Sequence, residues 1–126
     1  MAMNILDILL NNELPEQENK EVLIKRLSKA WETDVVIELK PVSFDRVNEI
    51  IKMDDENYKI HMILAGDAKG IFKNKTLMEK YNVPTPAELI KKLFLPGEIM
   101  ELELQVERLS GYGGKGESLI EEVKKK

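Results

Sequence analysis

The chain has 126 residues and a net charge of −4 at pH 7, with 43% apolar and 33% charged residues. This length and composition predict one folded domain over residues 1–126 and exclude a chain that is disordered throughout. The absence of cysteine excludes disulfides, thiolate nucleophiles and cysteine-based zinc sites, and it fits a reducing cytoplasm, where we expect the protein to act.

The acidic balance argues against nucleic acid as a partner, because such binding usually needs a clustered basic face. The one dense basic run, Lys124 to Lys126, is short and terminal. No apolar run approaches the roughly 18 residues of a membrane span. Residues 1–17 lack the basic segment of a signal peptide. We therefore expect neither a nucleic-acid nor a membrane partner.

The first 20 residues are expected to form an arm and a linker. Residues 3–11 are rich in Ile and Leu, which suits a short amphipathic helix or a docking segment. Residues 11–20 contain almost nothing apolar, and Pro15 interrupts them, so they are interpreted as the linker.

A short hairpin is predicted next. Residues 21–27 and 35–40 are interpreted as strands, because β-branched residues are present and Val35, Ile37 and Leu39 alternate with other residues. Residues 28–34 between them are expected to turn the chain. A lone hairpin is marginal in water, so it must pack on helices or pair with another chain.

Helices are predicted from Ser43 onward. Ser43 is a good N-cap for a helix over 44–53, with Phe44, Val47, Ile50 and Ile51 on one face. Residues 56–65 fit a strand by alternation and a helix by the spacing of Ile60, Ile63 and Leu64; we favour the helix.

Two further helices have clear N-terminal signals. Asn74 is expected to cap a helix that runs through Tyr81. Thr85 to Glu88 form a capping box with Pro at the first helical position, and Pro96 stops that helix.

The last long helix is predicted to begin at Pro96 itself. Its apolar seam consists of Ile99, Leu102, Val106 and Leu109, and Glu101, Glu103 and Glu107 lie mostly off it. Gly111 follows as a stop. Residues 111–126 are expected to be a flexible tail, of which the last nine could form a frayed helix.

No pattern of residues predicts catalysis, a cofactor or a metal site. The single histidine, His61, lies in an apolar run and is interpreted as a packing residue. The acidic cluster 54–56 lacks the ligand spacing of a calcium loop. Gly111 to Gly116 match the letters of a dinucleotide fingerprint, but the segment follows a predicted helix instead of a strand. We expect a protein that is not an enzyme.

The candidate partner-binding residues lie in two places. Trp31, in the expected hairpin turn, is either an interface anchor or a side chain folded onto its own domain. The other place is a corner between two predicted helices, with bulky apolar residues before a Pro-Gly step. It is interpreted either as an ordinary helix–helix corner or as an apolar lip for a partner. Its residues are Leu93, Phe94, Leu95, Pro96, Gly97 and Glu98.

Six segments between Lys40 and Tyr112, in their order and spacing, resemble the XkdN-like tail assembly chaperones of phages and defective prophages. They are Lys40–Ser43, Leu64–Gly66, Lys75–Val83, Thr85–Ile90, Leu93–Ile99 and Leu109–Tyr112. The departures are Phe94, where a smaller aliphatic residue is expected, and residues 67–70, where a valine and a proline-containing turn are expected.

The resemblance implies a chaperone that binds the tape measure protein during tail assembly and is absent from the finished particle. The tail tube protein is a further expected partner, as is a second copy of the chain. The alternative is a small structural or adaptor protein that stays in the tail. The expected fold is α+β: a short N-terminal β-hairpin packed on a mainly helical C-terminal part of about four to five helices.

Overall fold

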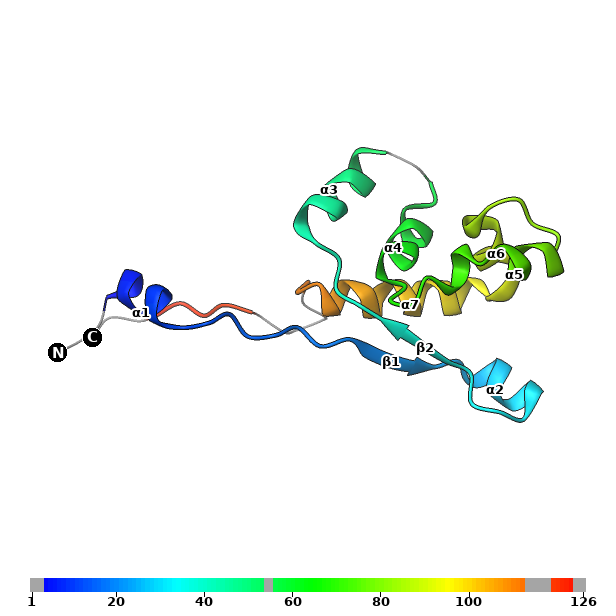
Figure 1. The fold of residues 1–126 in the computed structure, drawn as a ribbon, viewed down its shortest axis with the longest axis horizontal. Helices are drawn as coiled ribbons and strands as arrows, with labels where there is room; N and C mark the ends of the chain where they lie inside the picture. Colours follow the sequence, from blue (N-terminus) through cyan, green and yellow to red (C-terminus); the bar gives the residue numbers. More distant parts are fainter. Residues whose placement is uncertain (1–3, 54–55, 113–118, 124–126) are drawn as a thin grey trace.

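The computed structural model describes residues 4–53, 56–112 and 119–123. Within these ranges a two-stranded sheet joins a mainly helical body, which confirms the expected α+β class (Figure 1). The elements in chain order are α1 (Ile5–Asn11), β1 (Lys20–Leu23), α2 (Lys25–Trp31), β2 (Val36–Leu39), α3 (Phe44–Lys52), α4 (Tyr58–Gly66), the 3-10 helix η1 (Ile71–Lys73), α5 (Lys75–Lys80), α6 (Pro86–Leu93) and α7 (Pro96–Leu109).

The two strands pair antiparallel, from Lys20 opposite Leu39 to Leu23 opposite Val36. The expected strand over 21–27 and turn over 28–34 are wrong in part, because the strand ends at Leu23 and α2 follows it. Ile24 and Leu27 are 7% and 8% exposed. Their i, i+3 spacing brings both to one side of a helix, whereas a strand would turn them to opposite faces. Burial of this pair in the core therefore favours the helix.

Helix α4 is the centre of the body and packs against α3, α6 and α7. Ile60, Met62 and Ile63 are all buried, with Met62 and Ile63 completely inaccessible. A helix that is covered on several sides shows no single apolar stripe. This explains why residues 56–65 also matched a strand, and the helix that we favoured is confirmed.

The end of α4 holds the hairpin against the body. The Lys40 N–H donates to the Gly66 carbonyl at 2.8 Å, and the Ala68 N–H donates to the Glu38 carbonyl at 3.1 Å. A Cβ on Gly66 would lie 2.7 Å from a methyl group of Val106 on α7. Only a glycine therefore lets α4 cross α7 this closely.

The helix boundaries follow the capping signals in the sequence. The side chains of Ser43, Asn74 and Thr85 each accept a hydrogen bond from the backbone N–H three residues on, at 3.2, 2.9 and 3.1 Å. Gly111, two residues past the end of α7, has φ 92°, and the Tyr112 N–H donates to the Glu107 carbonyl at 2.9 Å. This is a Schellman ending, which glycine favours.

Three expectations about side chains and termini were wrong. Phe44 and Ile51 are 76% and 55% exposed, so only Val47 and Ile50 of that face enter the core. Glu103 is 2% exposed, although it was placed off the apolar seam of α7. Residues 119–123 are not helical, and the other residues of the expected terminal helix lie outside the described ranges.

Candidate functional site

The corner between α6 and α7 is built around Glu98. Its carboxylate accepts a hydrogen bond from the Leu95 N–H at 2.8 Å, at the start of α7. It also accepts from the Arg26 guanidinium on α2, with Nε and Nη2 at 3.1 and 2.9 Å. The same Nη2 donates to the Leu93 carbonyl at 2.9 Å. One arginine thus ties α2 to the end of α6 and the start of α7.

These contacts shift two pKa values. The hydrogen bond from Arg26 lowers the pKa of the Glu98 carboxyl, partial burial opposes this, and the hydrogen bond from the Leu95 N–H and the charge of Arg26 lower the pKa further. The hydrogen bond to Glu98 raises the pKa of Arg26. Both groups therefore stay charged at neutral pH, and the pair is a fixed ionic clasp.

The predicted corner residues divide between the core and the surface. Phe94 is 6% exposed, and its ring meets that of Phe72 edge-on with centroids 5.7 Å apart. Leu93 is half-buried against the core. Leu95 is 51% exposed, and Pro96 and Gly97 are exposed beside it. The surface that a partner can touch at this corner is therefore Leu95, Pro96 and Gly97.

Trp31 does not lie in a turn. It is the last residue of α2, the helix that Arg26 fastens to the corner, and it is 53% exposed. A tryptophan with about half of its surface accessible is a large exposed residue on a helix of only seven residues. Trp31 thus remains available to a partner, as the interface interpretation requires.

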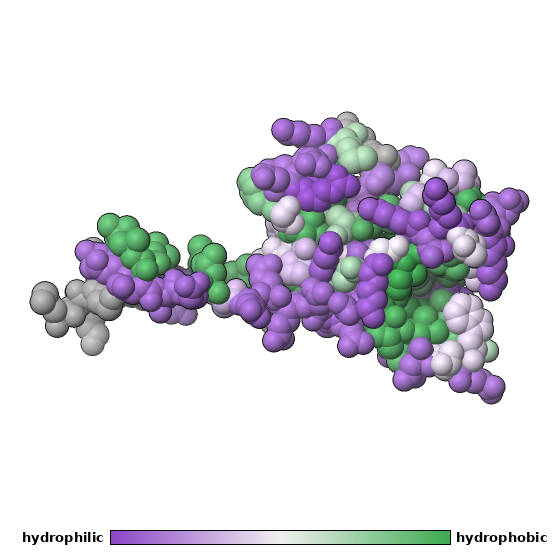
Figure 2. Space-filling model, in the orientation of Figure 1, coloured by the Kyte–Doolittle hydropathy of each residue, from purple (hydrophilic) through white to green (hydrophobic). Residues whose placement is uncertain are grey.

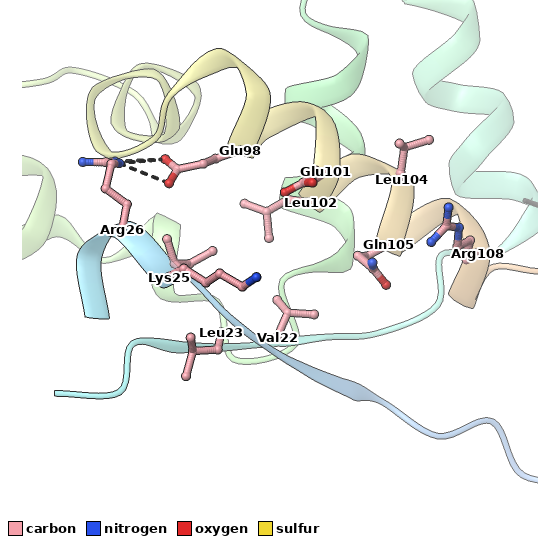
Figure 3. A pocket seen from close by; sticks show the side chains of 11 residues that line it. Val22, Leu23, Lys25, Arg26, Glu98, Glu101, Leu102, Leu104, Gln105 and Arg108 are labelled. Carbon is pink, nitrogen blue, oxygen red and sulfur yellow. Dashed lines mark hydrogen bonds and ion pairs between the residues drawn. The ribbon is translucent and has the colours of Figure 1, made fainter. Parts of the chain in front are cut away.

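A groove that the sequence did not predict lies between the hairpin and α7. It has a volume of about 480 Å³, and apolar groups of Val22, Leu23, Leu102 and Leu104 line it. Figure 3 shows the Arg26–Glu98 clasp at one end and Gln105 and Arg108 at the other. We call this feature the β1–α7 groove. Its further lining residues are Ile24, Lys25 and Glu101.

The second unpredicted feature is how fully α1 is exposed. None of its residues is buried, and Figure 1 shows it well away from the body at the end of an extended linker. Figure 2 shows apolar residues gathered on this arm and on the body near α2. The exposed apolar side chains of α1 are Ile5, Leu6, Ile8, Leu9 and Leu10, with 42–73% of each accessible.

The described residues contain no group of three His, Asp or Glu side chains that could hold a metal ion. Asp54 and Asp55, and residues 113–116 of the glycine-rich segment, lie outside the described ranges. No helix among the described residues is long and apolar enough to cross a membrane.

A small helical body with a clasped corner, an open groove and an exposed apolar arm has the surfaces of a protein-binding domain. The sequence model of the family described as phage XkdN-like tail assembly chaperone protein matches residues 6–124. The chain therefore belongs to this family of tail assembly chaperones. That is a non-enzymatic kind of role, and its partners are phage tail proteins.

The crystal structure of the protein YqbN has the same fold, with a TM-score of 0.69 over 89% of this chain and 100% of that one. The two sequences are 21% identical. A search of the curated proteins found no match.

Sequence reasoning found the corner but missed the groove and the clasp. The groove needs β1 and α7, which are about 80 residues apart in the chain, to lie side by side. Arg26 was assigned to a strand, and nothing local links it to Glu98, 72 residues later. The available signal was the short apolar segment 3–11, which was interpreted as an amphipathic helix or a docking segment and indicated nothing about a groove elsewhere in the chain.

Proposed function

We propose that this chaperone binds the tape measure protein in the bacterial cytoplasm, keeps it soluble until the tail tube forms around it, and leaves before the particle is complete. In this role it catalyses nothing. Membership of the tail assembly chaperone family supports a tail protein as the partner. Among tail proteins, the tape measure is the one whose long apolar helix faces need cover before assembly.

The observation that carries the proposal is the exposed corner on a rigid support. Leu95 is 51% exposed, while the residue before it is buried in the core and the residue three positions on is clasped by Arg26. The backbone at Leu95 is held in this way, so it loses little conformational entropy when a partner helix covers the side chain. Trp31, on the clasped helix α2, adds a second accessible apolar group.

Each such contact is small and therefore weak. When many copies of the chaperone bind along one long partner, the high effective concentration raises the overall binding strength. Each copy can still be displaced singly. This suits a protein that must first coat the tape measure and later give way to polymerising tube subunits. A contact between the chaperone and the tube protein would help the exchange.

The test is co-expression of the chain with the tape measure protein encoded beside its gene, followed by a pull-down at several salt concentrations. We expect the tape measure to become soluble and to co-purify. Leu95→Asp should weaken this binding about tenfold or more, because burying a leucine contributes roughly 1.5–3 kcal/mol. Ile51→Asp is the matched control, since Ile51 is equally exposed, at 55%, but lies on α3.

Failure of the tape measure to bind at any salt concentration would refute the proposal. Equal weakening by both aspartate variants would remove the corner as the contact. Mass spectrometry of purified particles separates the chaperone from its alternative. Stoichiometric presence of the chain in finished tails would assign it to a retained structural or adaptor protein.

A further inference from the structure

Helix α1 is capped by asparagine side chains at both ends, and its apolar face is uncovered. The Asn4 side chain accepts from the Asp7 N–H at 2.9 Å, which caps the first turn. The side chains of Asn11 and Asn12 donate to the carbonyls of Asp7 and Ile8, each at 2.7 Å. A helix of seven residues is too short to persist alone in water, because nucleation is costly. It therefore needs a surface that covers its leucine and isoleucine side chains.

The β1–α7 groove matches this helix in chemistry and size. Leu23 and Leu104, which line it, are 45% and 40% exposed and so are free to accept apolar contacts. A seven-residue helix is about 10 Å long, which suits a groove of about 480 Å³ whose lining residues on α7 extend from Glu98 to Arg108.

The charges of the arm and the groove are complementary. Between Asn4 and Asn19 the chain carries four acidic residues and no basic one. Lys25, Arg26 and Arg108 line the groove, against Glu98 and Glu101. Among the described residues Lys25 and Arg108 form no ion pair, so both cations can meet an incoming carboxylate. An acidic amphipathic segment is therefore a better occupant than a basic one.

The linker directs the arm away from the groove of its own chain. It continues the line of β1, and the Asn19 side chain donates to the Glu38 carboxylate on β2 at 2.8 Å, which holds the end of the linker beside the sheet. Figure 1 shows α1 at the far end of this extended segment, well away from α7. To enter the groove of its own chain, the arm would need the linker to reverse its direction. Without such a reversal, the arm can enter only the groove of another copy.

We propose that α1 of one copy docks in the β1–α7 groove of a second copy. The arm and the groove are different surfaces, so the contact allows two kinds of assembly. Two copies can exchange arms to form a closed dimer, or each copy can bind the next in an open filament. An open filament of copies would present the α6–α7 corner at regular intervals. The contact needs only this protein, so it does not depend on the identity of the tail partner.

The lack of cysteine makes cross-linking a direct test. One chain carries Leu9→Cys on the arm and the other carries Leu104→Cys in the groove, and a short bismaleimide is added to their mixture. We expect a covalent heterodimer. Mixing Leu9→Cys with Ile51→Cys is the control, because Ile51 is exposed on α3 and does not line the groove.

Sedimentation equilibrium supplies the second measurement. The mass of the native chain should rise with concentration above that of one 14.5 kDa copy. Leu9→Asp should weaken association about tenfold or more, because it places a carboxylate on the docked face. Phe44→Asp, at a site that is 76% exposed on α3, should leave the mass unchanged. Circular dichroism checks that both variants stay folded.

Three results would overturn the proposal. The first is a chain that stays monomeric and gives no heterodimer. The second is a cross-link that forms only inside a chain carrying both cysteines, which would place the arm in its own groove. The third is association that Leu9→Asp leaves intact while it abolishes tape measure binding, which would assign the arm to the tail partner. The first two leave the tape measure proposal standing.

Discussion

Glu103 shows how one residue can oppose the pattern of its own helix. It is 2% exposed at the contact between α7 and α4, and one carboxylate oxygen has no hydrogen-bond partner among the described residues. Burial, followed by a hydrogen bond with Glu107 and repulsion from it, raises the pKa of Glu103 to about 8, and Lys59 opposes the shift. Because this pKa lies above 7, Glu103 is protonated at neutral pH. Across the interface, burial raises the pKa of Tyr58, with smaller effects of Glu107 and Glu103.

This protonation predicts a pH-dependent stability. The folded chain binds a proton at Glu103 up to about pH 8, whereas the unfolded chain releases it near pH 4.5. Stability from this group is thus complete below pH 4.5 and is lost as the pH rises to about 8, by up to about 5 kcal/mol. Glu103→Gln keeps the shape without the charge, so the slope of unfolding free energy against pH in this window should flatten.

Urea denaturation across that pH window measures the slope. Glu101→Gln, on the exposed side of the same helix, should keep the native slope. A slope that survives in Glu103→Gln would show that another group titrates.

At the scale of elements, the contact between α4 and α7 depends on one glycine. A Cβ at residue 66 would meet both methyl groups of Val106, at 2.7 and 2.9 Å, and the Lys40 carbonyl oxygen at 3.3 Å. Val106 is completely buried, so its methyl groups cannot move out into solvent. Helices α4 and α7 and Lys40, the residue after β2, therefore pack closely around a position that has no side chain.

Gly66→Ala should lower the free energy of unfolding by about 1–3 kcal/mol, because overpacking forces the helices apart. Val106→Ala in the same chain should recover part of this loss, since the clash is with its methyl groups. Thermal and urea unfolding of the single and double variants measure the coupling. Gly97→Ala is the control, because a Cβ there meets nothing within 4 Å. Additive losses in the double variant would contradict the proposed clash.

At the scale of the whole molecule, the arm and the body are energetically separate. The core consists of buried residues between Ile24 and Val106, and α1 contributes none. A chain that begins at Asn19 should therefore unfold with the same free energy as the full chain, within about 0.5 kcal/mol. Urea denaturation of both chains provides the check. It is done at low protein concentration, where the copies do not associate. A clear loss of stability would mean that the arm packs on its own body.

Sequence alone determined the features that depend on near neighbours. The caps at Ser43, Asn74 and Thr85, the proline start of α7 and the glycine at its end all appear where they were predicted, since each is satisfied within a few residues. The α+β class followed from periodicity, and the ordered segments from Lys40 to Tyr112 were enough to indicate the family.

Tertiary structure decided what distant residues do to one another. It turned residues 25–31 into a helix, because Ile24 and Leu27 gain burial together. It drew Phe94 into the core against Phe72 and left Leu95 outside, and it joined Arg26 to Glu98. Each of these results depends on which elements meet across the chain, which is set by the sum of many weak packing contacts and not by any local pattern.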